Sequence, residues 1–283
     1  MSVNILYCEG GKNSPDIRIV ANLLVGVCVI KPALSKKGLD RKILFIRQEK
    51  LLPGSTVAAL KDRDFDQNDS EPVNSPKDWK VKDNEKDVQI GWSWERKEIE
   101  NYLIDPEVVS RALGSKSPKI EDYQAALENS AKTIADYTAA RIALSVCWQS
   151  YFPLQNCWGN VGIEHGHSFP PSLAESDCRY EIKNIVNNYK QVQPIGENKV
   201  MNSFDSLLYP CRIGGNRFKN FLTFFSGKDL LFGMKSELNS WGFQQPSDFR
   251  ERVVNGIEKS PDNVWTWLPE WNQLRQLIQK AAF

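Results

Sequence analysis

The chain has 283 residues, of which 41% are hydrophobic and 25% are charged, and its formal net charge is +1. This composition is ordinary for a globular protein with a buried core, and the near-neutral charge excludes a protein that coats nucleic acid with a strongly basic surface. The apolar run Ile19–Ile30 is shorter than the roughly 20 residues that a membrane helix needs. Residues Met1–Leu6 lack a basic region, so we expect no signal peptide, no membrane association and a cytoplasmic location.

The first hundred residues alternate between strand and helix patterns. We predict a buried strand over residues 3–8, a helix over 17–27, and further strands over 43–46 and 56–60. Residues 65–87 are polar and are predicted to form a long surface loop, followed by a strand over 88–94. Strands that alternate with a helix are typical of a parallel sheet, so the expected fold is α/β, of the Rossmann-like kind with flanking helices.

The remainder of the chain is predicted to be mainly helical. Residues 98–103 form a helical turn, and Asp105-Pro106-Glu107 begins a helix with an N-cap, a proline at N1 and an acid in the first turn. We place a boundary between residues 112 and 113, separating the α/β core (1–112) from a helical region (113–283). Further helices are expected over residues 118–148, 180–190, 216–224, 227–239, 247–257 and 268–280.

Three acidic residues follow two of the predicted strands. Glu9 ends the first strand, and Asp62 and Asp64 end the strand at 56–60. Ligand sites in open α/β sheets lie beyond the carboxyl ends of the strands, so these side chains are expected to converge. Carboxylates that project together need a cation, and their hard oxygen atoms suit Mg²⁺. Gly10 and Gly11 permit a tight turn beside Glu9.

Other interpretations of the acidic run exist. An EF-hand loop needs glycine at its sixth position and glutamate at its twelfth, where this chain has Gln67 and Val73, so we discard it. An Asp-x-Asp pair also occurs in sugar-nucleotide transferases, and phosphatases follow it with Thr or Val where Asp66 stands here. A solvated acidic turn is the simplest alternative.

The order of these motifs resembles the TOPRIM fold. The resemblance lies in Tyr7-Cys8-Glu9-Gly10 and in Leu60-Lys61-Asp62-Arg63-Asp64. The run Glu98-Ile99-Glu100-Asn101-Tyr102-Leu103 is similar to the element that follows Asp-x-Asp in the OLD-like branch of TOPRIM nucleases, as in the stand-alone TOPRIM effector of the PARIS anti-phage system. Relatives often read Glu-Gly-Lys-x-Asp, whereas an apparent insertion here leaves the roles of Lys12 and Asp16 open.

This resemblance implies a Mg²⁺-dependent endonuclease with one or two ions, Mn²⁺ being an alternative. Asp62 and Asp64 would bind the metal, Glu9 would bind it or act as general base, and Glu100 would serve a second ion. A salt bridge to Arg96 is the alternative role of Glu100. Lys228, in Phe225-Ser226-Gly227-Lys228, resembles a late Gly-Lys motif and would return to the site from the helical region; an ordinary surface lysine is the alternative.

The same resemblance implies partners. It predicts the toxic effector of a bacterial defence system, released from an ABC-type ATPase to cleave tRNA or DNA, with a homodimer after activation as an open possibility. The basic residues that we expect to contact phosphates are Lys36, Lys37, Arg41, Lys42, Arg212 and Arg217. A solvated basic face is the alternative for each. Primase-type nucleotidyl transfer and a non-catalytic metal-binding subunit are the competing functions.

The six cysteines form no Cys-x-x-Cys pair, and we expect reduced thiols. Cys157, His165, His167 and Cys178 could imitate a zinc site, but the spacing C-x₇-H-x-H-x₁₀-C matches no common zinc module. A structured loop rich in aromatic residues is the favoured interpretation, and such a loop could dock a partner. Zinc binding stays open.

Overall fold

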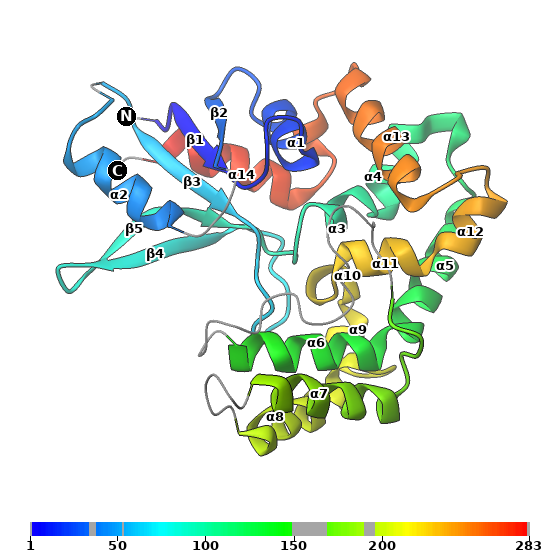
Figure 1. Cartoon of the computed structure of the whole chain (residues 1–283). Coiled ribbons are helices and arrows are strands. Elements are labelled where there is room, and N and C mark those ends of the chain that lie inside the picture. Colours follow the sequence, from blue (N-terminus) through cyan, green and yellow to red (C-terminus); the bar gives the residue numbers. More distant parts are fainter. Residues whose placement is uncertain (1, 34–37, 53, 149–168, 190–195, 282–283) are drawn as a thin grey trace. The chain divides into compact units, whose positions relative to one another are not determined.

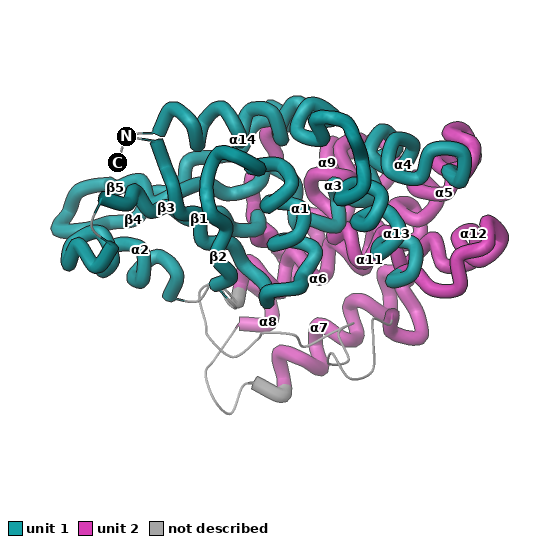
Figure 2. Tube along the Cα trace, turned by 90° about the horizontal axis from the view of Figure 1, so that it is seen from above, with its two compact units in different colours: residues 1–63, 72–117, 247–283 teal, residues 64–71, 118–246 magenta. Residues whose placement is uncertain are grey.

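The computed structural model describes residues 2–33, 38–52, 54–148, 169–189 and 196–281 (Figure 1). These residues form two compact units, coloured separately in Figure 2. Unit 1 comprises residues 1–63, 72–117 and 247–283, and unit 2 comprises residues 64–71 and 118–246. The final 37 residues therefore belong to the unit that contains the sheet, whereas the sequence pattern grouped them with the helical region.

Unit 1 contains a five-stranded sheet in the order β2-β1-β3-β5-β4. β1 pairs in parallel with β2 and β3, β3 pairs in parallel with β5, and β4 is antiparallel to β5. The α/β class and the mainly parallel sheet are as expected. The strands are β1 (Ile5–Cys8), β2 (Val29–Pro32), β3 (Val57–Lys61), β4 (Lys77–Asp83) and β5 (Lys86–Ser93).

Helices cover the sheet of unit 1. Its helices are α1 (Pro15–Leu23), α2 (Leu39–Gln48), α3 (Glu100–Leu103), α4 (Pro106–Leu113), α13 (Pro246–Lys259) and α14 (Pro269–Lys280), with short 3₁₀ turns at Gly114–Lys116 and Val264–Thr266. Alternate strand residues Ile5, Tyr7, Val57 and Ala59 pack against the buried face of α2. Figures 1 and 2 show α14 on the side of the strands opposite α2.

The segment 43–46 is helical, which corrects the predicted strand there. Leu39, Ile43 and Ile46 lie on one buried face of α2 while Phe45 is exposed, which is helical rather than strand periodicity. The second strand of the sheet is instead β2, an edge strand whose exposed Val29 and Pro32 conceal the usual pattern. The predicted loop over 65–87 also contains β4, another edge strand. The helix start at Asp105 is confirmed, since its side chain accepts from Glu107 N.

Unit 2 is helical in the residues that the structure describes. The predicted helix over 118–148 is two helices, α5 (Ile120–Thr133) and α6 (Ala135–Trp148), with Ile134 between them. The others are α7 (Glu175–Tyr189), α8 (Glu197–Cys211), α9 (Asn216–Lys219), α10 (Phe221–Phe224), α11 (Gly227–Gly233) and α12 (Lys235–Ser240). The sequence pattern did not reveal α8. No helix in the described ranges is both long and apolar enough to cross a membrane.

Candidate metal centre

Glu9 and Asp62 lie at the same edge of the sheet. β1 and β3 are adjacent parallel strands in which Cys8 pairs with Leu60. Glu9 follows Cys8 directly, and Asp62 follows Leu60 by two residues. Both acids are half-buried. The structure thus brings these two predicted residues to the carboxyl ends of neighbouring strands, where α/β proteins bind their ligands.

A turn built on Gly10 brings a third acid to this edge. Gly10 has φ of +98°, and a Cβ there would lie 2.2 Å from Ser14 Oγ and 3.4 Å from Asp16 Oδ2. Ser14 caps α1 by accepting from Ile17 N at 3.4 Å, and Asp16 occupies the first turn of that helix. Glycine therefore allows the helix start, with the Asp16 carboxylate, to approach the turn after β1.

The carboxylates of these three acids affect the pKa of the Cys8 thiol. Burial is the largest cause that raises the pKa of Cys8, and the neighbouring Cys28 adds to it. The carboxylates of Asp16, Asp62 and Glu9 each raise it further. Glu9 follows Cys8, Asp62 follows its pairing partner Leu60 by two residues, and Asp16 lies close to Gly10, so these three acids lie around the end of β1. Like charges gathered in this way favour the binding of a cation.

The donor chemistry of these acids fits Mg²⁺, which prefers oxygen ligands. In the part of the chain that the structure describes, no three His, Cys, Asp or Glu side chains are already arranged to hold a metal ion. Binding one ion in common would thus require the side chains of Glu9, Asp16 and Asp62 to turn toward it.

Asp62 and Asp64 are not related by strand geometry. β3 ends at Lys61, so the alternation of side chains along a strand does not extend to these two residues. Between them, Arg63 is 6% exposed and donates to Glu95 O at 2.9 Å. Asp62 belongs to unit 1, and Asp64 is the first residue of segment 64–71, which belongs to unit 2. We call residues 64–71 the aspartate segment.

Arg141 of α6 connects the aspartate segment to the helix that carries Lys228. Its Cζ lies 5.4 Å from the ring centre of Phe65, and its Nη1 pairs with Asp229 Oδ2. Phe65 and Asp229 are both buried, whereas Lys228 is exposed as the second residue of α11. Arg141 therefore contacts both Phe65, which follows Asp64 in the sequence, and Asp229, which follows Lys228, all within unit 2.

Glu100, the predicted fourth acid, is buried at the start of α3. Its Oε1 accepts from Arg250 Nη1 of α13 at 3.0 Å. The alternative role as an ion-pair partner was thus right for Glu100, but the partner is Arg250. Arg96 instead pairs with Asp105 at 2.8 Å. An ion pair satisfies part of the Glu100 carboxylate, so a role with a metal requires it to share or leave Arg250.

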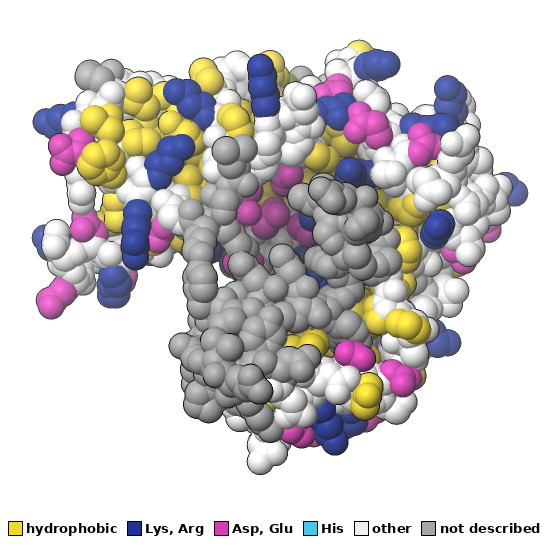
Figure 3. Space-filling model, viewed as in Figure 1, with side chains coloured by type: hydrophobic (Ala, Val, Ile, Leu, Met, Phe, Trp, Pro, Cys, Tyr) yellow, Lys and Arg dark blue, Asp and Glu magenta, His cyan; other side chains and the backbone are white. Residues whose placement is uncertain are grey.

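The predicted phosphate contacts differ in their availability. Arg41 and Lys42 are exposed on α2, and Lys42 Nζ lies 4.3 Å from the Tyr7 ring centre. Arg217 is 1% exposed and pairs with Asp69, so its charge is already engaged inside unit 2. Lys36 and Lys37 lie outside the described residues. On the face in Figure 3, the described Lys and Arg side chains are scattered rather than gathered in one patch.

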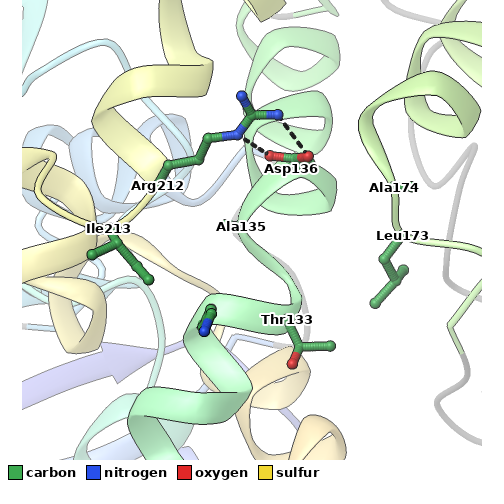
Figure 4. A pocket seen from close by; sticks show the side chains of 8 residues that line it. Thr133, Ala135, Asp136, Leu173, Ala174, Arg212 and Ile213 are labelled. Carbon is green, nitrogen blue, oxygen red and sulfur yellow. Dashed lines mark hydrogen bonds and ion pairs between the residues drawn. The ribbon is translucent and has the colours of Figure 1, made fainter.

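Arg212 lines a pocket of about 420 Å³ in unit 2. Its Nε and Nη2 bind the Asp136 carboxylate at 2.7 and 2.8 Å (Figure 4), and Nη2 also binds Glu175 at 2.6 Å. Two acids thus neutralise this arginine. The other lining residues are Lys132, Thr133, Ala135, Leu173, Ala174 and Ile213.

Most of the imitation zinc site lies outside the described residues, since Cys157, His165 and His167 fall within 149–168, as does most of the aromatic loop. Cys178 is buried on α7.

Sequence reasoning left Asp16 without a role and did not single out Arg63 or Glu95. The resemblance left Asp16 open, because this chain departs from the pattern Glu-Gly-Lys-x-Asp between Gly10 and Asp16. No local pattern pointed to Arg63 or Glu95, because they lie 32 positions apart.

The chain matches no protein-family model and no curated protein with significant similarity.

Proposed function

We propose that the protein is a Mg²⁺-dependent endonuclease of the TOPRIM type, in the OLD-like branch. The observation that carries the proposal is the position of Glu9 and Asp62 beyond the ends of adjacent parallel strands, with Asp16 close to the Gly10 turn that follows Glu9. Acidic side chains at the carboxyl ends of parallel strands, as Glu9 and Asp62 are, support a ligand site. The order of Glu9-Gly10 and Asp62-Arg63-Asp64 along the chain supports the family.

Each residue has a role in this proposal. Asp62 and Asp64 would hold the cation, and Asp16 would contribute a third carboxylate. Bound Mg²⁺ would neutralise charge on the scissile phosphate and on the leaving oxygen. Glu9 orients the attacking water and accepts its proton. Lys228 would donate to a phosphate oxygen as charge develops there. Glu100 would serve a second ion, for which its carboxylate would have to leave Arg250.

The proposed setting is bacterial anti-phage defence. The chain would act as a toxic effector that an ABC-type ATPase restrains and releases on infection. The substrate would be tRNA or DNA, because phosphodiester chemistry does not itself read a base. This part of the proposal is supported by the motif resemblance alone.

The test is expression of the free chain in bacteria, followed by sequencing of new nucleic-acid ends. We expect toxicity and new ends with the natural chain, and neither with Glu9→Gln. Glu49→Gln, a change at an exposed acid after α2, is the matched control and should remain toxic. Unchanged cleavage by a folded Glu9→Gln variant would refute the mechanism, and new strands in place of new ends would indicate a transferase.

A further inference from the structure

Two aromatic side chains of unit 1 lie in one row across its sheet. Tyr7 of β1 pairs with Ala59 of β3, and Ala59 pairs with Gly91 of β5. Gly91 in turn pairs with Trp79 of β4. Tyr7 and Trp79 both pack with the core cluster that includes the buried face of α2, so both rings lie on the α2 side of the sheet. They are three steps between strands apart, roughly 14 Å.

A lysine ammonium lies over each of these rings. Lys42 Nζ of α2 lies 4.3 Å from the Tyr7 ring centre. Lys61 is the last residue of β3, and its Nζ lies 4.6 Å from the Trp79 ring centre. Among the residues that the structure describes, neither ammonium has a carboxylate at ion-pair distance. A ring face attracts an ammonium without accepting all of its donors, so both lysines can bind an anion.

A serine and another lysine extend the group at the level of Lys61. Ser93 of β5 pairs in register with Lys61 on one side and with Lys77 of β4 on the other. Ser93 is half-buried, and its hydroxyl can donate a hydrogen bond. Lys77 Nζ lies 3.4 Å from Glu95 Oε2, so its charge is partly neutralised. Lys61 and Ser93 therefore supply neighbouring donors at the carboxyl ends of β3 and β5.

The arrangement of these donors suits the phosphates of a polymer. Lys42 and Lys61 lie over rings that are roughly 14 Å apart, which is too far for one phosphate to contact both. They can instead bind separate phosphates of one chain. The lysine ammonium is a point charge on a flexible stem, and such contacts hold the backbone of a nucleic acid without reading its bases.

We propose that Lys42, Lys61 and Ser93 form a binding site for the phosphate backbone of a nucleic acid. The inference rests on the proposed function for the identity of the polymer, but it requires no bound metal and no residue of unit 2. Lys42 was one of several phosphate contacts expected from the sequence, whereas Lys61 and Ser93 had no role there. Lys61 directly precedes Asp62, so the site lies beside the acids of unit 1.

The test is binding of a short fluorescent single-stranded oligonucleotide, as DNA and as RNA, to the full chain in EDTA. Affinity is measured at several salt concentrations, and thermal unfolding shows that each variant is folded. We expect Lys42→Gln and Lys61→Gln each to lower the slope of log affinity against log salt by about 0.7, and to weaken binding about 5-fold near 0.1 M salt. Lys61→Arg, which keeps the charge and the ring contact, should retain the slope. Ser93→Ala should weaken binding without changing the slope, because serine carries no charge.

The double variant Lys80→Gln/Lys82→Gln is the matched control. Both lysines are exposed on β4 and have carboxylate partners, Asp78 and Asp87. It makes the same change of charge as Lys42→Gln/Lys61→Gln, and we expect it to leave the affinity and the slope unchanged. An equal loss in the two double variants would overturn the site, since it would reflect net charge alone.

The remaining outcomes separate the two proposals. Unchanged affinity and slope in folded Lys42→Gln/Lys61→Gln, or no binding by the natural chain, would overturn this inference. Displacement of the oligonucleotide by inorganic phosphate at an equal concentration of phosphate groups would overturn it too, because the site would then take single phosphates. Lysine-dependent binding without cleavage in Mg²⁺ would overturn the nuclease and retain this site. Cleavage with binding that is independent of these lysines would do the reverse.

Discussion

Arg63 and Glu95 form a buried pair beside the candidate metal centre: Arg63 Nη1 lies 3.7 Å from Glu95 Oε1, and their side chains are 6% and 2% exposed. The same nitrogen donates to Glu95 O at 2.9 Å. Because Arg63 stands between Asp62 and Asp64, this pair attaches the acidic run to the segment that follows β5.

Replacing Arg63 by Ala should destabilise the protein by about 3–5 kcal/mol, because it leaves the Glu95 carboxylate buried with one lysine 3.4 Å away, Lys77. Urea unfolding measures the change. Lys82→Ala is the control, since Lys82 and Asp87 form an exposed pair that should contribute less than about 1 kcal/mol. Equal effects of the two substitutions would contradict the importance of the buried pair.

Glu270 should make stability depend on pH. Its carboxylate accepts from Glu95 N and from Tyr102 Oη, both at 2.6 Å, yet burial raises its pKa to about 7. Between its unfolded pKa near 4.5 and about pH 7, the folded chain holds a proton that the unfolded chain releases, so stability falls as pH rises. The loss contributed by this group is on the order of 3 kcal/mol.

The measurement is chemical unfolding of the natural chain and of Glu270→Gln at several pH values from 4 to 8. The free energy of unfolding of Glu270→Gln should increase relative to that of the natural chain as pH rises, because glutamine does not ionise. A difference that is constant across this range would show that Glu270 ionises as readily in the folded chain as in the unfolded one.

Gly91 of β5 should be irreplaceable for reasons of space. A Cβ at this position would lie 1.8 Å from Ala59 O of the paired strand β3. Gly91→Ala should therefore separate β3 from β5 and destabilise the fold by about 3 kcal/mol or more. Gly196→Ala meets no atom within 4 Å and is the matched control. Thermal unfolding of both variants tests this, and a Gly91→Ala variant as stable as the control would contradict the observed strand pairing.

Much of the fold near the site could be predicted because its signals are local. The buried run ending at Cys8, the Gly10 turn and the cap at Asp105 each lie within a few residues. The strand predicted over 43–46 was wrong because four consecutive apolar residues also fit a buried strand. The helical spacing becomes clear only when Leu39 is included, since it lies on the same buried face of α2 as Ile43 and Ile46. The edge strands β2 and β4 bury too few side chains to produce a clear pattern.

The contacts around the acids could not be predicted, because they join distant parts of the chain. Arg250 meets Glu100 across 150 positions, and Arg217 meets Asp69 across 148. A single sequence gives only the residue type at each position. It does not distinguish an arginine that binds a carboxylate from one that faces solvent. The acidic residues themselves were predicted, whereas their arginine partners required the structure.

The central claim is tested most directly by incubating the purified chain with tRNA and with plasmid DNA, in Mg²⁺ and in EDTA. We predict cleavage of at least one substrate that requires Mg²⁺ and falls to background in a folded Asp62→Asn variant. Cleavage that continues in EDTA or in Asp62→Asn, or no cleavage of either substrate by the natural chain, would contradict the assignment of a metal-dependent nuclease.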